Sequence, residues 1–232
     1  MKEKICRYFQ DWNSFEKGYV ITGLVLTLLT TFICKGDLLQ LVYSVSFMMN
    51  AILLSKGRVE CYFFALAGIL AYVIISFRQH YYGEVIINAC LYLPMSIYGL
   101  TRWLKSTSSD GHTVKINYVT RKEIITAIST QAVMVFAYYM ILKAFNTDNL
   151  ILGVISIAFS VLANYFEMRI SIWSLYFFIG VDTTIAVMWL IPILQGQISL
   201  LPVIVAPLLL LVSDVYGTVN WRKLEKSQKD EP

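Results

Sequence analysis

Long apolar runs separated by short polar segments dominate the chain. Eight of these runs are long enough for membrane-spanning helices, because a helix rises about 1.5 Å per residue and the apolar layer of a bilayer is about 30 Å thick. They cover residues 18–34, 38–54, 60–78, 82–103, 123–145, 149–168, 171–192 and 197–221. The pattern therefore predicts an all-α integral membrane protein with eight transmembrane helices.

Two short patterns occur twice in the same order, which indicates an internal duplication. An Asn is followed twelve residues later by Tyr-Phe-Phe, and further on a Tyr-Gly pair is followed by Trp four residues after the Gly. The matching positions are Asn50 with Tyr62-Phe63-Phe64, Asn164 with Tyr176-Phe177-Phe178, Tyr98-Gly99 with Trp103, and Tyr216-Gly217 with Trp221. We interpret the helices of residues 38–103 and 149–221 as two related three-helix units.

Basic residues gather on one side of the predicted spans. Of the 19 Lys and Arg residues, only Lys35, Arg78 and Lys143 fall on the side opposite the N-terminus. Cytoplasmic loops are the ones enriched in Lys and Arg, so both termini are predicted to be cytoplasmic. One extra helix, 123–145, lies between the two units and gives them the same orientation. They are therefore predicted to be parallel repeats, related by an axis along the membrane normal.

The predicted organisation has seven parts. They are a cytoplasmic amphipathic lead-in (1–17), an extra N-terminal helix (18–34), a first three-helix bundle (38–103), a cytoplasmic loop (104–122), a linker helix (123–145), a second three-helix bundle (149–221) and a cytoplasmic tail (222–232).

Composition supports a membrane protein and argues against several functions. Hydrophobic residues make up 57% of the chain, and charged residues only 15%. The net charge of +4 comes from basic residues that flank apolar runs, so no nucleic-acid partner is expected. Four cysteines without a CxxC spacing predict neither a disulfide framework nor a metal site, and no cofactor is expected. Motifs of hydrolases, nucleotide-binding proteins and dehydrogenases are missing, so we do not expect an enzyme.

Polar residues inside the apolar runs are the candidate functional residues. Asp182 lies near the middle of a predicted helix, where a carboxylate is costly unless it faces a cavity, a partner or a substrate. Asn50, Asn88 and Asn164 could instead form interhelical hydrogen bonds. The repeat places Asn50 and Asn164 on opposite sides of a central axis, so we expect both to face one cavity.

Aromatic residues suggest the kind of ligand. Trp173 and Tyr176 lie one turn apart on the helix that carries Asp182, and Tyr92 is a further aromatic candidate. Such rings can hold a flat cation by cation–π attraction beside a carboxylate. Tyr176 and Asp182, however, differ by about 120° around the helix, so both can line a cavity only if it is wide.

In order along the chain, these residues resemble the PnuC-type vitamin and nicotinamide riboside transporters. The resemblance covers about residues 38–225. It is carried by Asn50-Ala-Ile-Leu-Leu-Ser-Lys-Gly57, Tyr62-Phe63-Phe64, Tyr82-Gly83-Glu84, Asn88, Leu93-Pro94-Met95, Tyr98-Gly99, Trp103, Ala163-Asn164, Arg169, Trp173, Tyr176, Tyr216-Gly217 and Trp221. It implies two three-helix bundles joined by a linker helix, as in the SWEET sugar facilitators, with one substrate bound between them.

The resemblance also implies a mechanism, namely facilitated diffusion by alternating access in a bacterial inner membrane. A cytoplasmic kinase would phosphorylate the arriving substrate and prevent its return. Nicotinamide riboside members usually have Trp-x-x-Trp and then Asn, whereas this chain has Tyr176 and Gly180, and Ser96 stands where many members have Gln. Nicotinamide riboside is the first candidate substrate and thiamine the nearest alternative, since both contain a cationic aromatic ring. Another vitamin or nucleoside carried within the family is a further alternative.

Two further alternatives stay open. The protein could be a membrane sensor or scaffold that binds a small ligand without carrying it, and copies could associate as a homo-oligomer. Within the repeat, Gly68 stands at the position of Asp182, so the first copy offers no carboxylate there. We therefore expect recognition to depend mainly on the second copy.

Overall fold

Helices are the regular elements of the computed structural model, which describes residues 12–79, 82–106, 114–146 and 149–230. In these residues eight helical segments are long and apolar enough to cross a membrane, which confirms the predicted all-α class. The elements are α2 (Ser14–Ile33), α3 (Leu38–Ser55), α4 (Cys61–Arg78), α5 (Tyr82–Ile87), η1 (Asn88–Tyr92), α6 (Leu93–Lys105), α7 (Arg121–Ala144), α8 (Leu150–Met168), α9 (Trp173–Leu194), η2 (Ile198–Leu200) and α10 (Leu201–Asp230).

Two helices extend beyond the apolar runs that predicted them. α2 begins at Ser14 because Asn13 and Glu16 form a capping box, in which each side chain accepts a hydrogen bond from the other residue's backbone N–H. The helix thus begins inside the predicted lead-in 1–17, of which residues 1–11 lie outside the described residues. α10 continues to Asp230 through polar residues with good helix propensity, so most of the predicted tail 222–232 is helical.

The span predicted at residues 82–103 is interrupted by the π-helical turn η1. Pro94 follows this turn and has no N–H to donate to the carbonyl of Cys90. The N–H of Leu93 bonds instead to the carbonyl of Asn88, five residues earlier, which is the π-helical pattern. Both ends of the turn, Asn88 and Tyr92, are buried.

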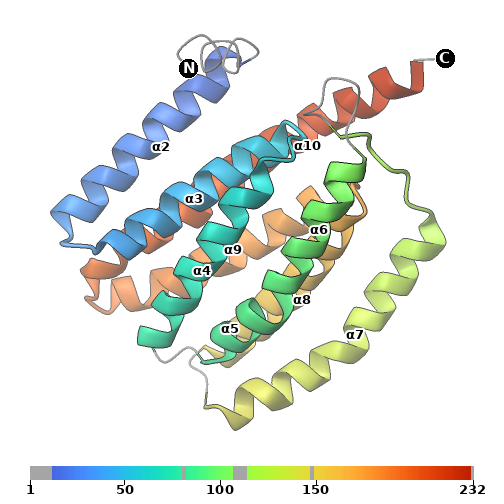
Figure 1. Ribbon diagram of the computed structural model, residues 1–232. Coiled ribbons are helices and arrows are strands. Elements are labelled where there is room, and N and C mark those ends of the chain that lie inside the picture. Colours follow the sequence, from blue (N-terminus) through green and yellow to red (C-terminus); the bar gives the residue numbers. More distant parts are fainter. Residues whose placement is uncertain (1–11, 80–81, 107–113, 147–148, 231–232) are drawn as a thin grey trace.

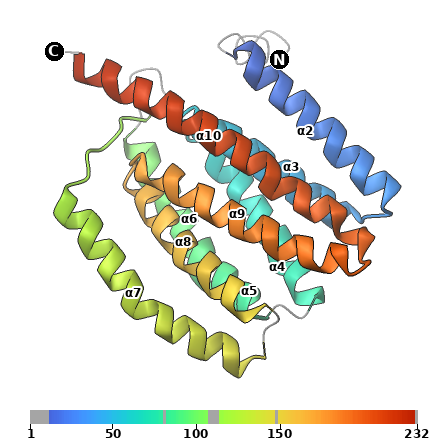
Figure 2. The ribbon, with the colours of Figure 1, turned by 180° about the vertical axis from the view of Figure 1, so that it is seen from behind.

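α2 and α7 lie on the two flanks of the bundle, with the other helices between them (Figures 1 and 2). α3 packs against α10, and α6 packs against α8, so the first helix of each predicted unit contacts the last helix of the other. This exchange of contacts is the one expected for two parallel units around a common axis. The start of α2 and the end of α10 share one end of the bundle, which we call the terminal end; the opposite end is the distal end.

A buried cluster occupies each end of the bundle. The terminal cluster includes Leu54, Tyr62, Trp103 and Trp221, and the distal cluster includes Tyr43, Tyr72, Trp189 and Val203. In the terminal cluster the indole N–H of Trp103 donates to the carbonyl of Glu167 at 2.9 Å. The indole N–H of Trp221 donates to the carbonyl of Leu54, also at 2.9 Å. These reciprocal bonds link the two three-helix units.

The two Tyr-Gly pairs of the repeat have a packing reason. A Cβ atom at Gly99 would lie 2.5 Å from the hydroxyl oxygen of Tyr62, and a Cβ atom at Gly217 would lie 2.9 Å from the Cβ of Ser55. Neither distance leaves room for a methyl group. Glycine is therefore required at both positions for the helices to approach each other this closely.

Candidate functional site

A cavity of about 120 Å³ lies between the two three-helix units and is lined by residues of both. Its walls come from α3, α4, the α5–η1–α6 span, α8, α9 and α10. Tyr43 and Tyr72 of the distal cluster and Leu54 of the terminal cluster belong to the lining. The cavity thus occupies the middle of the bundle, where a solute crossing the protein would have to pass.

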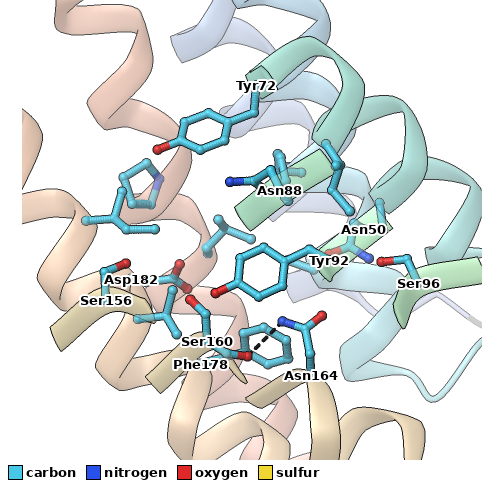
Figure 3. Close-up of a pocket in the computed structure, with 18 of the residues that line it drawn as sticks. Asn50, Tyr72, Asn88, Tyr92, Ser96, Ser156, Ser160, Asn164, Phe178 and Asp182 are labelled. Carbon is cyan, nitrogen blue, oxygen red and sulfur yellow. Dashed lines mark hydrogen bonds between the residues drawn. The ribbon is translucent and has the colours of Figure 1, made fainter. Parts of the chain in front are cut away.

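The three predicted asparagines all line this cavity (Figure 3). The side-chain amide of Asn50 donates to the carbonyl of Cys61 at 3.0 Å, and that of Asn164 donates to the carbonyl of Ser160 at 2.8 Å. The amide of Asn88 donates to the carbonyl of Glu84 at 2.8 Å and lies 3.3 Å from its carboxyl group. Each amide is therefore held in a fixed orientation, and Asn50 and Asn164 approach the cavity from different units.

Asp182 also lines the cavity, together with three acidic residues that the sequence analysis did not propose as site residues. These are Glu84, Glu167 and Asp214. Asp182 and Asp214 are 4% and 3% exposed, and their carboxyl groups lie next to each other. Asp214 could have been found by the rule that selected Asp182, because it too lies within a long apolar run.

The position of Asp214 fits the predicted repeat. The offset of 118 residues between Trp103 and Trp221 pairs Asp214 with Ser96. Both residues line the cavity, one from each unit. Three of the four carboxyl groups (Glu167, Asp182 and Asp214) come from the second unit, and Glu84 comes from the first. The first unit therefore also contributes a carboxyl group to the cavity. It comes from Glu84 on α5, whereas the repeat position of Asp182 in this unit is Gly68 on α4.

The charge of the lining is one-sided. Among the described residues, the lining contains four acidic side chains and no Lys, Arg or His. Aromatic rings of Tyr43, Phe47, Tyr72, Tyr92 and Phe178 complete much of the wall. Within the described residues, the hydroxyl groups of Tyr72 and Tyr92 and one carboxyl oxygen of Asp214 are buried and make no hydrogen bond of good geometry. Unpaired polar atoms of this kind are costly unless a ligand or water bonds to them.

Trp173 and Tyr176 are not part of this lining. Their rings contact each other edge to face at 5.7 Å, and the hydroxyl group of Tyr176 accepts hydrogen bonds from Arg222 near the terminal end. The geometry of α9 gives the reason, since Phe178 and Asp182 differ by only about 40° around the helix, whereas Tyr176 points about 120° away from Asp182. On this helix the aromatic wall is therefore formed by Phe178.

Comparison with known proteins gives matches over most of the chain. The family model described as "Nicotinamide mononucleotide transporter" matches residues 37–223. A nicotinamide riboside transporter PnuC of Neisseria mucosa is 24% identical in an alignment of 228 positions that covers 94% of this chain and 84% of that protein. One of Haemophilus influenzae is 23% identical in an alignment of 228 positions that covers 94% of each chain. A crystal structure of "the Vitamin B3 transporter PnuC" superimposes with a TM-score of 0.84 at 21% identity, covering 95% of each chain.

Proposed function

Because the chain belongs to the nicotinamide mononucleotide transporter family, we propose that it carries nicotinamide riboside across the membrane. The observation that supports this substrate is the one-sided charge of the cavity. Nicotinamide riboside contains a pyridinium ring, which is flat, aromatic and positively charged. Four carboxyl groups attract such a ring, and the aromatic side chains of the wall can stack on it or hold it by cation–π contact.

The same cavity argues against a phosphorylated substrate. A mononucleotide carries a phosphate group, which proteins usually bind with Arg, Lys or helix N-termini. The lining of the cavity contains no basic residue in the described part of the chain, and four carboxyl groups would repel the phosphate. The riboside is therefore the better candidate, and the relatives from Neisseria mucosa and Haemophilus influenzae are named for transport of the riboside.

The proposed mechanism is uniport by alternating access. A cavity between two units, with a buried cluster at each end, suits a carrier that opens to one side at a time. The protein would let substrate move down its gradient, and a cytoplasmic kinase would trap it by phosphorylation. The family resemblance implies a bacterial inner membrane, and the distribution of Lys and Arg favours both termini in the cytoplasm.

Reconstitution in liposomes tests this function. Labelled nicotinamide riboside should exchange into liposomes preloaded with the unlabelled compound, and nicotinamide mononucleotide should not compete. Net accumulation above the outside concentration should require an enclosed kinase with ATP. Accumulation without them would overturn uniport. Binding without exchange would identify a sensor instead of a carrier.

Thiamine is the second candidate, favoured by the paired carboxyl groups of Asp182 and Asp214. Thiamine combines a cationic thiazolium ring with an aminopyrimidine, whose amino group and ring nitrogen suit a carboxyl group. Affinities of the purified protein for nicotinamide riboside and thiamine, measured by titration calorimetry, separate the two. Tighter binding of thiamine would move the substrate assignment to the vitamin.

A further inference from the structure

A second hollow lies at the terminal end of the bundle and shares no residue with the central cavity. It has a volume of about 560 Å³ and lies between the end of α6, the end of α8 and the extended segment 115–117. Its lining consists of Arg102, Lys105, Ser106, Lys115, Ile116, Asn117, Arg169 and Ile170. Four of these residues are basic and none is acidic.

Backbone hydrogen bonds hold the outer wall of this hollow in place. The N–H of Lys115 donates to the carbonyl of Ser106 at 3.2 Å, and the N–H of Asn117 donates to the carbonyl of Ile170 at 2.9 Å. Between them, the N–H of Ile116 donates to the side chain of Gln228 on α10 at 2.9 Å. The segment is thus fixed to α6, α8 and α10, and the basic residues converge on one concave surface.

Most of this positive charge has no acidic partner among the described residues. Arg169 forms a salt bridge with Glu123 at 2.7 Å, and this hydrogen bond is the main cause that raises the pKa of its guanidinium group. The side chains of Arg102, Lys105 and Lys115 make no ion pair or hydrogen bond within the described residues. Three cations without an ion pair in the described part of the chain therefore border the same hollow, beside the hydrogen-bonding side chains of Ser106 and Asn117.

Membrane orientation alone would explain basic residues at this end of the helices. Membrane orientation does not require the basic residues to line a common hollow. Arg121 and Lys122 at the start of α7 are basic residues of the same end that lie elsewhere. Both are exposed, and neither lines this hollow. The charges around the hollow also lie near the C-terminal ends of α6 and α8, where cations are favourable, but no described hydrogen bond ties them to the carbonyl groups there.

We propose that this hollow binds a phosphate group. Arg and Lys with neighbouring hydroxyl and amide groups are the side chains that proteins use for phosphate. The hollow lies at the ends of membrane-spanning helices, where basic pockets can hold lipid headgroups. The phosphate can therefore be that of an anionic phospholipid or of a soluble monoester. The site does not depend on the identity of the transported substrate.

Binding to the full-length protein in phosphatidylcholine nanodiscs tests the proposal in two arms. In the first, ribose 5-phosphate is titrated and binding is followed by ³¹P NMR line broadening. In the second, phosphatidylglycerol is added to the nanodiscs and the lipids retained by the protein are identified by native mass spectrometry. Saturable binding in either arm supports the site and identifies the source of the phosphate, and its absence from both arms overturns it.

Matched variants show whether binding occurs at the hollow. R102Q/K105Q/K115Q should weaken binding about tenfold or more, because each removed cation contributes to holding the anion. R121Q/K122Q/K226Q removes the same charge from exposed positions of the terminal end and should leave binding within about twofold. Equal weakening in both variants would overturn the site in favour of general charge attraction. Nicotinamide riboside counterflow, measured on the same variants after reconstitution in liposomes, reports independently on the central cavity and on folding.

Discussion

Asp182 and Asp214 place two buried carboxyl groups side by side in a cavity that also contains Glu84 and Glu167. Ionised carboxyl groups in such a position repel each other and have lost most of their hydration. A bound cation removes both penalties, since it offsets the repulsion and replaces water as the partner. At the scale of single residues, the acidic pair is therefore expected to contribute to both affinity and selectivity for positive charge.

Replacing either member of the pair by its amide tests this role. Asp182→Asn and Asp214→Asn preserve shape but remove the charge, so each should weaken the binding of nicotinamide riboside by about tenfold. Titration calorimetry on purified protein gives the affinity. Asp37→Asn is the matched control, because Asp37 pairs with Arg78 at the exposed distal end, away from the cavity. Unchanged affinity in both cavity variants, with folding intact, would remove the pair from the binding site.

Trp173 provides the opposite test. Its ring is 37% exposed and contacts Tyr176 and Phe177, outside the cavity lining. Trp173→Ala should therefore change affinity for nicotinamide riboside by no more than about twofold, whereas Phe178→Ala should weaken it several-fold by removing a ring from the wall. The same calorimetric assay measures both. If Trp173→Ala weakens the affinity for nicotinamide riboside more than Phe178→Ala does, the substrate contacts Trp173, as the sequence predicted, and not the ring of Phe178.

At the scale of helices, hydropathy predicted the number and order of the membrane spans but not their rotation. Most of α9 is apolar, so hydropathy alone does not show which side of it faces inward. Once Asp182 is placed in the cavity, the helical angle selects Phe178 over Tyr176. Asn50 and Asn164 were found because the repeat supplied a symmetry axis, and Asn88 because it is a polar residue within an apolar run. Glu84 and Glu167 were missed because they lie near helix ends, where charged residues ordinarily contact the interface.

Close packing between helices gives a further prediction at this scale. A methyl group at Gly217 would lie 2.9 Å from the Cβ and 3.2 Å from the Cα of Ser55, so α10 would have to move away from α3. Gly217→Ala should lower the stability of the fold by about 1 to 3 kcal/mol. Gly18→Ala on α2 has nothing within 4 Å of the new methyl group and is the control. Thermal unfolding in detergent compares them, and equal midpoints would contradict the packing argument.

For the whole molecule, the two reciprocal indole bonds connect the three-helix units at the terminal end. Trp103 bonds to a carbonyl at the end of α8, and Trp221 bonds to one at the end of α3. Both indoles are fully buried together with Tyr62. In the proposed alternating-access mechanism, we expect these bonds to break when the cavity opens toward the terminal end, because they join the two units. The distal cluster around Trp189 closes the other end by packing of its own.

Loosening the terminal closure should therefore expose Cys61, which is fully buried in the terminal cluster and whose carbonyl accepts the bond from Asn50. In a version of the chain whose other cysteines are replaced by serine, W103F/W221F should raise the rate of Cys61 labelling by a water-soluble maleimide several-fold. Each Phe keeps an aromatic ring but cannot donate the interunit bond. Trp189→Phe, an equally buried change in the distal cluster, should leave the rate near that of the parent. If Trp189→Phe accelerates labelling as much as W103F/W221F does, the indole bonds do not hold the terminal end closed and general destabilisation accounts for the exposure.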